Sequence, residues 1–282
     1  MDIAIDRRIV VTGAVVLFTC FLTELMIAQP SEPSPAALIH RVVQNELNLE
    51  HQDNSHWMVQ LKTQNKNGQM EVDEVVETNA GDLSRPIEIN GHELTAQQRQ
   101  QSDAQLGRNP AALRKMLKEK NEDAVKSQEM LRILPNAFIF TYGEHRGDLT
   151  QLLFKPNPKF HPSSHEAEVF HAMEGNVWVD EKQNRLAEMS GHLIERVNFG
   201  GGFLGHLDKG GTFDVQQQEV APGYWELTVL NVQMNGKALF FKTIRVRQAY
   251  SRSDFKRVPD DLTIQKGVQM LKEQATHQGS QS

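Results

Sequence analysis

Residues 224–249 carry the sequence YWELTVLNVQMNGKALFFKTIRVRQA, and this stretch decides the fold. Apolar side chains stand at every second position, as at Trp225 and Leu227, and this period of two is that of an extended strand. Asn235 and Gly236 are the strongest short turn signal in the chain, because both central positions of a two-residue hairpin turn require a left-handed backbone. The stretch therefore predicts two antiparallel strands joined by a tight turn.

Extended segments with a similar alternation recur along most of the chain. The polar run 65–68 predicts the turn of an early hairpin, and Asn90 with Gly91 predicts a further tight turn. Strands are predicted at 57–62, 70–78, 86–89, 138–142, 152–155, 165–173, 177–180, 185–197, 212–220, 224–234 and 238–249. The early hairpin and the segments from 138 onward make about nine or ten strands connected by short turns, which predict a mainly β (α+β) fold with a large curved antiparallel sheet or an incomplete β-barrel.

Helical spacing of apolar residues marks the two ends of this β-rich region. A helix is predicted over 35–48, with Ser34 as its cap and Pro35 in its first turn. Its apolar stripe consists of Leu38, Val42, Val43 and Leu47. A closing helix is predicted from Asp260 or the next residue through Leu271. Because one face of the first helix is apolar, that helix must pack on another part of the fold.

A polar, helix-favouring block occupies residues 95–134. Asn109 and Pro110 have the character of a cap and a first-turn residue, so they predict the start of a second helix within the block. This second helix is predicted to end before Pro135. A disordered polar insertion is the alternative for 96–108. The block is predicted to lie across one side of the sheet.

The first 28 residues differ in composition from the rest of the chain. Arg7 and Arg8 precede an apolar run over 9–22, and Ala28 offers a small residue for cleavage, which is the order of a signal peptide. A retained membrane anchor is the alternative, because the run extended to Ala28 could span a bilayer. The segment predicts an exported protein of the periplasm or cell envelope of a bacterium. Its membrane contact would be transient or made through this segment.

Cys20 is the only cysteine, and it lies inside the predicted leader, so the mature domain would contain no disulfide. Lipidation at Cys20 is an open alternative to an inert apolar cysteine. Behind the leader, the proline-rich residues 29–36 predict a linker. Residues 37–275 are predicted to form a single β-rich domain with the helical insertion at 95–134, followed by a frayed tail over 276–282.

Composition and charge exclude one class of partner. Of the residues, 39% are apolar and 23% are charged, and the formal net charge is −6, as in an ordinary soluble protein. Because nucleic-acid binding requires a strong basic excess, this charge predicts no DNA or RNA partner.

The chain contains 11 histidines, which invite a metal hypothesis. His165 and His171 would share one face of the strand predicted over 165–173, but extended chain would separate them by roughly 20 Å. The glycine-rich segment 200–211 leads into another strand, so it predicts a turn at the sheet rim, at the mouth of any cavity, and no phosphate loop. No serine stands in a nucleophile-elbow pattern. The sequence therefore predicts no catalytic residue, no cofactor and no metal ligand.

The faces of the strands determine where the helices must lie. Trp225 and Leu227 share one face of their strand, while Leu230 occupies the other, so both faces need an apolar cover. The helical segments 35–48 and 95–134 are predicted to cover the concave side. A loose cover would leave an apolar cavity between sheet and helices, whereas a tight cover would make the same side chains ordinary core. The side chains predicted to line the cavity are Trp178, Trp225, Leu227, Phe240 and Ile244.

Four short motifs accompany the order of helix, hairpin, helical block and β meander. They are GNVWVD at 175–180, the turn QNRL at 183–186, YWEL at 224–227 and LFFK at 239–242. On these motifs and this order, the chain from 36 to 250 resembles the bacterial outer-membrane lipoprotein-sorting superfamily, the lipoprotein-carrier (LolA, LolB and RseB-like) fold. The resemblance implies an incomplete barrel of about eleven strands with helices on its concave side. It also implies binding of acyl chains or lipidated segments between barrel and helices.

Three functional hypotheses follow. The first is an envelope protein that binds a hydrophobic ligand, a lipid or a lipoprotein acyl chain, between sheet and helices. The second is a regulatory or scaffold module that binds another envelope protein through an exposed sheet edge or through residues 95–134. The third is a hydrolase built from dispersed carboxylates, which would need a polar cleft with perturbed ionisable groups.

Overall fold

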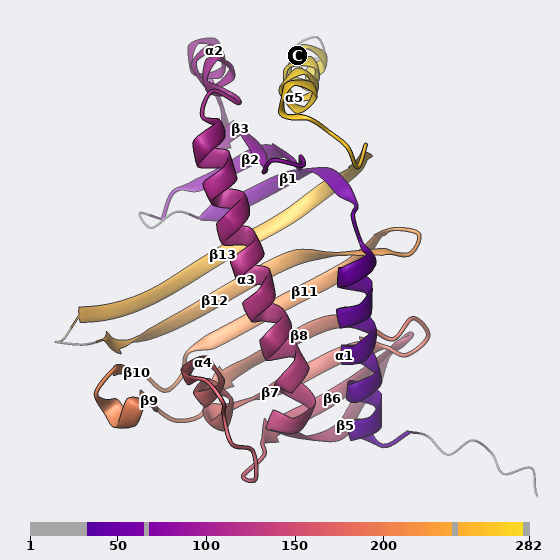
Figure 1. Cartoon of the computed structure of the whole chain (residues 1–282), viewed down its shortest axis with the longest axis vertical. Helices are drawn as coiled ribbons and strands as arrows, with labels where there is room; N and C mark the ends of the chain where they lie inside the picture. Colours follow the sequence, from indigo (N-terminus) through magenta and orange to yellow (C-terminus); the bar gives the residue numbers. More distant parts are fainter. Residues whose placement is uncertain (1–32, 65–67, 239–241, 279–282) are drawn as a thin grey trace, which may run out of the picture. The chain divides into compact units, whose positions relative to one another are not determined.

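One antiparallel sheet of 13 strands dominates the computed structural model, which describes residues 33–64, 68–238 and 242–278 (Figure 1). The sheet is not closed into a barrel. The prediction of a mainly β protein with one large antiparallel sheet is confirmed. From Pro33 onward the chain forms one compact unit. The predicted signal peptide, Cys20 and most of the predicted linker lie outside the described residues.

The strands follow one another along the sheet in a meander with a single long-range junction. They are β1 (His56–Gln64), β2 (Met70–Val76), β3 (Leu83–Ile89), β4 (His92–Glu93), β5 (Phe138–Arg146), β6 (Leu149–Pro156), β7 (Met173–Asp180), β8 (Arg185–Leu193), β9 (Val197–Phe199), β10 (Gly205–Leu207), β11 (Thr212–Ala221), β12 (Tyr224–Ala238) and β13 (Lys242–Val258). Their order is β4-β3-β2-β1-β13-β12-β11-β8-β7-β6-β5, and β10 joins β9 to β12 beside this path. The first and last strands of the chain therefore lie side by side.

Five helices and two 3₁₀ turns complete the described part of the chain. They are α1 (Pro35–Gln52), α2 (Ala96–Gln105), α3 (Pro110–Ala137), α4 (His165–Glu168), α5 (Ile264–Gln278), η1 (Val169–Ala172) and η2 (Gly200–Gly202). Within the residues described, no helix combines the length and apolar character that a membrane crossing requires.

The first hydrophobic core lies between the sheet and two helices, α1 and α3, which cross the same face of it (Figure 1). α1 begins where predicted, because the Ser34 side chain accepts a hydrogen bond from the Ala37 amide at 3.2 Å and Pro35 occupies the first turn. Its stripe is fully buried, as at Leu38 and Val42. The strands opposite contribute β-branched and aromatic side chains such as Val177 of β7. The predicted helical cover on one side of the sheet is therefore present.

Two further cores occupy opposite faces of β1 and β2. Met58 and Val76 pack with Leu271 of α5 in the second core. Trp57 and Val75 belong to the third core. Because neighbouring residues of a strand point to opposite faces, β1 and β2 are buried on both sides. Burial on both sides explains why the two faces of β1 and β2 carry equal numbers of apolar residues.

Two connections between neighbouring strands agree with the sequence prediction. β1 and β2 pair as the predicted early hairpin, although residues 65–67 of its predicted turn lie outside the described residues. Asn90 and Gly91 join β3 to β4, and both have positive φ angles, of 51° and 79°. A left-handed backbone at both positions is what an Asn-Gly turn supplies at little cost.

The strongest turn signal, Asn235 with Gly236, is wrong. β12 continues through both residues to Ala238, where Gly236 pairs with Ile244 of β13 and with Leu207 of β10. A Cβ atom added to Gly236 would lie 2.1 Å from a backbone oxygen of β10. The glycine is therefore needed for the close approach of a third strand, and not for a turn.

The prediction of a strand over 165–173 is also wrong. Ser164 accepts a hydrogen bond from the Ala167 amide at 3.2 Å, and this cap starts the short helix α4, which leads into η1. His171 therefore lies in a helical turn, and the argument from strand spacing does not apply to it. The predicted long strand 185–197 is likewise divided into β8 and β9.

Two predicted helix ends are too early. α3 runs through Pro135 to Ala137, because Leu134 and Ala137 are buried in the first core and this packing outweighs the hydrogen bond that a proline nitrogen cannot donate. α5 extends from Ile264 to Gln278, beyond the predicted end at Leu271. The alternative of a disordered insertion at the start of the polar block does not match α2, which begins with a capping box.

Candidate functional site

α3 is firmly packed only at its carboxyl end. Leu134 and Ala137 are buried in the first core, and Leu131 packs against that core. Near the other end of the helix, Leu113 packs against the second core. No residue of α3 before Leu134 is buried, and side chains between the two ends, such as Leu117, are at most half-buried. The middle of α3 therefore crosses the sheet without sealing it.

A row of half-buried side chains crosses the sheet on the face that α3 covers. Its members are direct cross-strand partners in the order Val215, Leu230, Tyr250, Thr63 and Glu71, from β11 to β2. Val215 packs against the first core, which contains residues of α1 and α3, so the row lies on the helix-covered face. Along the row, the surface changes from apolar side chains to an acidic one.

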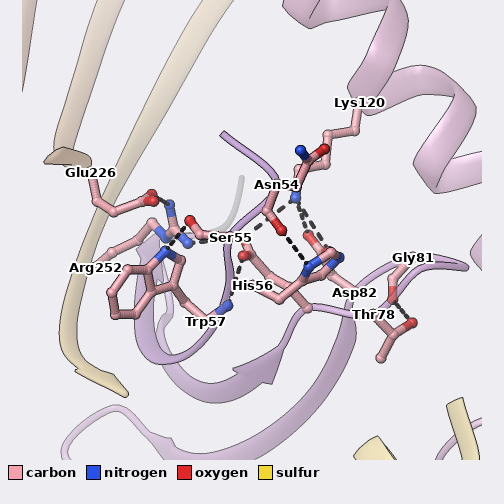
Figure 2. Close-up of polar contacts among 11 residues, drawn as sticks. Asn54, Ser55, His56, Trp57, Thr78, Gly81, Asp82, Lys120, Glu226 and Arg252 are labelled. Carbon is pink, nitrogen blue, oxygen red and sulfur yellow. Dashed lines mark hydrogen bonds and ion pairs between the residues drawn. The ribbon is translucent and has the colours of Figure 1, made fainter. Parts of the chain in front are cut away.

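Beside this row, five charged side chains form an ionic chain of alternating sign (Figure 2). Arg252 of β13 binds Glu226 of β12 and Glu77 after β2, with a distance of 3.1 Å in both ion pairs. Lys120 of α3 binds Glu77 at 3.5 Å and Asp82 at 2.9 Å. The ionic chain joins the middle of α3 to two strands of the sheet, β12 and β13, and to the segment between β2 and β3. With all groups ionised, three carboxylates and two cations leave one negative charge.

The surroundings shift the pKa values of three groups at this place. Burial raises the pKa of Glu226 above its ordinary value, against the opposing effect of Arg252. Burial also raises the pKa of Tyr250, although the positive charges of Arg252 and Lys120 act in the opposite direction. For Lys120, burial would lower the pKa, but Asp82 and Glu77 together raise it. Tyr250 therefore lies within the electrostatic reach of the ionic chain.

The row of half-buried side chains and the ionic chain together define the candidate site. Its donors are the Lys120 ammonium, the Arg252 guanidinium and the Tyr250 hydroxyl, and its acceptors are half-buried carboxylates. Apolar surface beside a small number of fixed polar groups suits a molecule with an apolar part and a polar end. Among the described residues, no group of three or more histidine, cysteine or acidic side chains could hold a metal ion.

An open pocket of about 440 Å³ lies elsewhere, where β1 and β13 change register, and Glu74 and Lys256 are in its lining. Glu74 is neutralised by the buried guanidinium of Arg85 at 3.2 Å, and Arg85 also binds Asp103 of α2 at 2.7 Å. This three-residue cluster holds α2 on β3. These charged groups therefore have a structural role.

The structure brings together only two of the five side chains predicted to line a cavity. Trp225 and Leu227 lie two residues apart on β12, and both are half-buried. The Trp225 indole donates a hydrogen bond to Gln183 at 3.0 Å, and the Arg185 guanidinium lies 5.3 Å from its ring. Arg185 in turn binds Glu46 of α1, so this pair belongs to the α1 side of the sheet.

The other three predicted lining residues lie apart from this pair. Trp178 alternates along β7 with Val177 and Val179 of the first core, so it points to the opposite face, where Arg146 stacks on it at 4.5 Å. Phe240 is outside the described residues. Ile244 belongs to β13 by its backbone, and its side chain is not among those described.

Sequence reasoning missed the ionic chain completely. Arg252 and Glu77 are 175 residues apart in the chain, and Lys120 is 43 residues from Glu77. No motif or spacing connects them, because only the pairing of β1 with β13 and the path of α3 bring them together. The strand predicted over 238–249 stops just before Tyr250 and Arg252, whereas β13 continues to Val258.

Comparison with known proteins adds no relative to this description. No protein-family model matches the chain, and neither a curated protein nor a solved structure matches it.

Proposed function

We propose that this protein binds an amphipathic lipid-like ligand, such as a lipid or a lipoprotein acyl chain, between α3 and the face of β11, β12 and β13 that α3 covers. The apolar part of the ligand would lie along Leu230 and its neighbours, and the polar end would reach the ionic chain. The resemblance of the sequence to the lipoprotein-sorting superfamily supports the same class of ligand. We also place the protein in the periplasm or cell envelope of a bacterium, on the strength of its amino-terminal sequence.

The observation that carries this proposal is the incomplete burial beneath α3. A helix of 28 residues with buried side chains only from Leu134 onward leaves apolar surface on both itself and the sheet. Leu117 of the helix and Leu230 of the sheet are both half-buried, whereas the corresponding residues of α1, such as Val42 and Val43, are fully buried. Burying the remaining apolar surface against an acyl chain would be favourable, at roughly 25 cal/mol for each Å².

The polar end of the site includes charged side chains that are mostly shielded from water. Glu226, Glu77 and Arg252 have side chains that are 14–17% exposed, so their charges are largely withdrawn from water. Lys120 is 52% exposed and can turn toward a ligand without leaving a buried charge unpaired. A polar head group would exchange hydrogen bonds with this residue and with the Tyr250 hydroxyl.

Mass spectrometry of the organic extract of natively purified protein tests the proposal. We expect a co-purifying lipid in the wild type and its loss from the variant Leu230→Gln, because the polar amide would face the apolar part of the ligand. Val229→Gln is the matched control, since the adjacent residue points to the other face of β12. Thermal unfolding of both variants separates loss of ligand from loss of fold. Absence of lipid from the wild type extracted from its native host would contradict the proposal.

A scaffold function is supported by a different observation. α2 has no buried residue, and α3 exposes Met116 and Val125, at 53% and 55%. Exposed apolar side chains on a long helix suit a helical or grooved partner. A pull-down from envelope extract that depends on residues 95–134, and that survives Leu230→Gln, would favour the scaffold over the lipid carrier.

A further inference from the structure

The short loop between β9 and β10 presents two apolar side chains to solvent. Phe203 is 86% exposed and Leu204 is 43% exposed, and Phe203 is the most exposed large apolar side chain in the described part of the chain. The loop is held by backbone hydrogen bonds of 3.2 Å from Phe203 to Gly200 and from Leu204 to Phe199. The phenyl ring is therefore held outward by an ordered turn.

Glycines make this outward geometry possible. Gly200, Gly201, Gly202 and Gly205 all have positive φ angles, between 57° and 132°. Nothing lies within 4 Å of a Cβ atom added to Gly201 or Gly202, so these two glycines serve the backbone turn and not a close contact. A tight glycine turn needs no phenylalanine, and the fold gains no burial from this one. Together with the neighbouring Leu204, Phe203 forms a small apolar projection from the surface.

The surroundings of the loop are weakly basic, although the whole chain carries a net charge of −6. Lys209 and Lys237 are exposed, and Lys237 pairs through its backbone with His206 of β10. Arg196 lies 3.7 Å from Asp208, so that cation is largely balanced. Counting lysine, arginine and acidic residues over 195–209 together with Lys237 gives three basic and two acidic side chains, a surplus of one positive charge.

We propose that the β9–β10 loop is a membrane contact that places Phe203 and Leu204 in the interface of a bilayer containing anionic lipid. Aromatic and leucine side chains partition into the interfacial region, and flanking lysines bind acidic head groups. A projecting apolar turn matches a flat, deformable bilayer, whereas a protein partner would require a pocket of its own for the ring. This contact does not depend on the proposed lipid-like ligand.

Flotation with vesicles of phosphatidylglycerol and phosphatidylcholine tests the contact. We expect the full-length chain to float with these vesicles. The double variant Phe203→Ser/Leu204→Ser should bind about tenfold more weakly, which corresponds to about 1.4 kcal/mol. Met116→Ser is the matched control, because it removes an exposed apolar side chain from α3, away from the loop. Both variants should unfold at the wild-type temperature.

A local readout decides the question even if another part of the chain also holds the protein on vesicles. In the variant Phe203→Trp, fluorescence should shift to the blue on addition of anionic vesicles, and brominated lipids should quench it beyond the quenching of the wild type. Met116→Trp should show neither change. Equal flotation of wild type and double variant, together with no added quenching in Phe203→Trp, would overturn the proposal. A loop that serves a protein partner would give this negative result, while lipid extraction would still report separately on the proposed ligand site.

Discussion

At the junction of α1 and β8, a carboxylate and a guanidinium are buried together. Glu46 accepts hydrogen bonds from Arg185 at 2.8 and 3.1 Å and from the Leu186 amide at 2.7 Å. The two side chains are only 8% and 9% exposed. A pair of this kind contributes little net stability, but removal of one partner strands the other charge in a poorly solvated place.

Removing one partner of this ion pair should therefore lower the free energy of unfolding more than replacing both partners by apolar residues. We expect Arg185→Met to lower the free energy of unfolding by about 3–5 kcal/mol, because Glu46 would keep its charge without a counterion. The double variant Glu46→Leu/Arg185→Met should recover most of the loss. Urea unfolding of the wild type, both single variants and the double variant gives the coupling energy. A double variant no more stable than Arg185→Met would contradict this reading of the pair.

The carboxylate of Asp73, unlike that of Glu46, is only partly satisfied by hydrogen bonds. Its Oδ1 accepts no hydrogen bond from the described residues, while Oδ2 accepts one from the Ser84 hydroxyl. Burial raises the pKa of Asp73 above its ordinary value, and the bond from Ser84 opposes this. The folded pKa of Asp73 lies above its unfolded pKa. The protonated carboxyl therefore contributes to the free energy of unfolding, and this contribution is fully present below the unfolded pKa. It is lost as the pH rises through the folded pKa.

Asp73→Asn should therefore stabilise the protein at neutral pH and much less in acid. We expect a gain of about 1 kcal/mol at pH 7, because the substitution removes an unpaired buried charge. The gain should shrink as the pH falls through the raised folded pKa of Asp73, and it should be gone below the unfolded pKa, where the carboxyl is protonated in both states. Unfolding free energies measured across this range check the prediction, with the exposed Glu195→Gln as control. A gain of equal size at all pH values would speak against titration of Asp73.

Lys120 connects the middle of α3 to the segment between β2 and β3. Its ion pairs with Asp82 and Glu77 are the contact that crosses from this part of the helix to the sheet. Exposed ion pairs contribute little to global stability. Their effect is expected on the local opening of a helix that has no buried residue before Leu134.

Lys120→Met should loosen α3 without unfolding the protein. We expect faster amide hydrogen exchange in the amino-terminal half of α3, with the global free energy of unfolding changed by under about 1 kcal/mol. Lys118→Met is the matched control, because Lys118 pairs with Glu122 of the same helix. Unchanged exchange in α3 of Lys120→Met would show that the ionic chain does not hold the helix.

Elements defined by local chemistry are the ones that the sequence predicts. Ser34 and Pro35 mark the start of α1, and Asn90 with Gly91 marks a turn, because the cap and the turn are formed by those residues themselves. Gly236 gives a wrong turn prediction, because the glycine is required by the close approach of β10, which is distant in sequence. Fold class follows from strand alternation, which is a local property as well.

The candidate site could not be predicted in the same way. Trp225 and Leu227 could be selected because apolar alternation is visible in one strand, but neither belongs to the row or to the ionic chain. The ionic chain depends on where α3 crosses the sheet and on the pairing of β1 with β13, and no local pattern encodes either. Charged residues such as Arg252 look like ordinary solvent-facing positions until a partner from another element is placed beside them.

For the whole molecule, the two larger cores lie in different parts of the sheet. The first joins α1 and α3 to strands from β5 to β11, and the second joins α5 to β1, β2, β3 and the end of β13. The second core draws on fewer elements and contains the fully buried Leu271. A smaller core with its own helix can open while the rest of the fold persists.

Leu271→Ala should therefore act on one part of the molecule. The cavity left by a fully buried leucine costs about 2–5 kcal/mol. We expect hydrogen exchange to accelerate in α5, β2 and β3, where Leu83 and Val76 lose their packing, while α1 and β6 keep their protection. Leu152→Ala is the matched control, because this equally buried leucine belongs to the first core, which most strands share, so its loss should accelerate exchange throughout. Uniform acceleration in both variants would mean that the sheet, continuous through β1 and β13, couples the two cores into one cooperative unit.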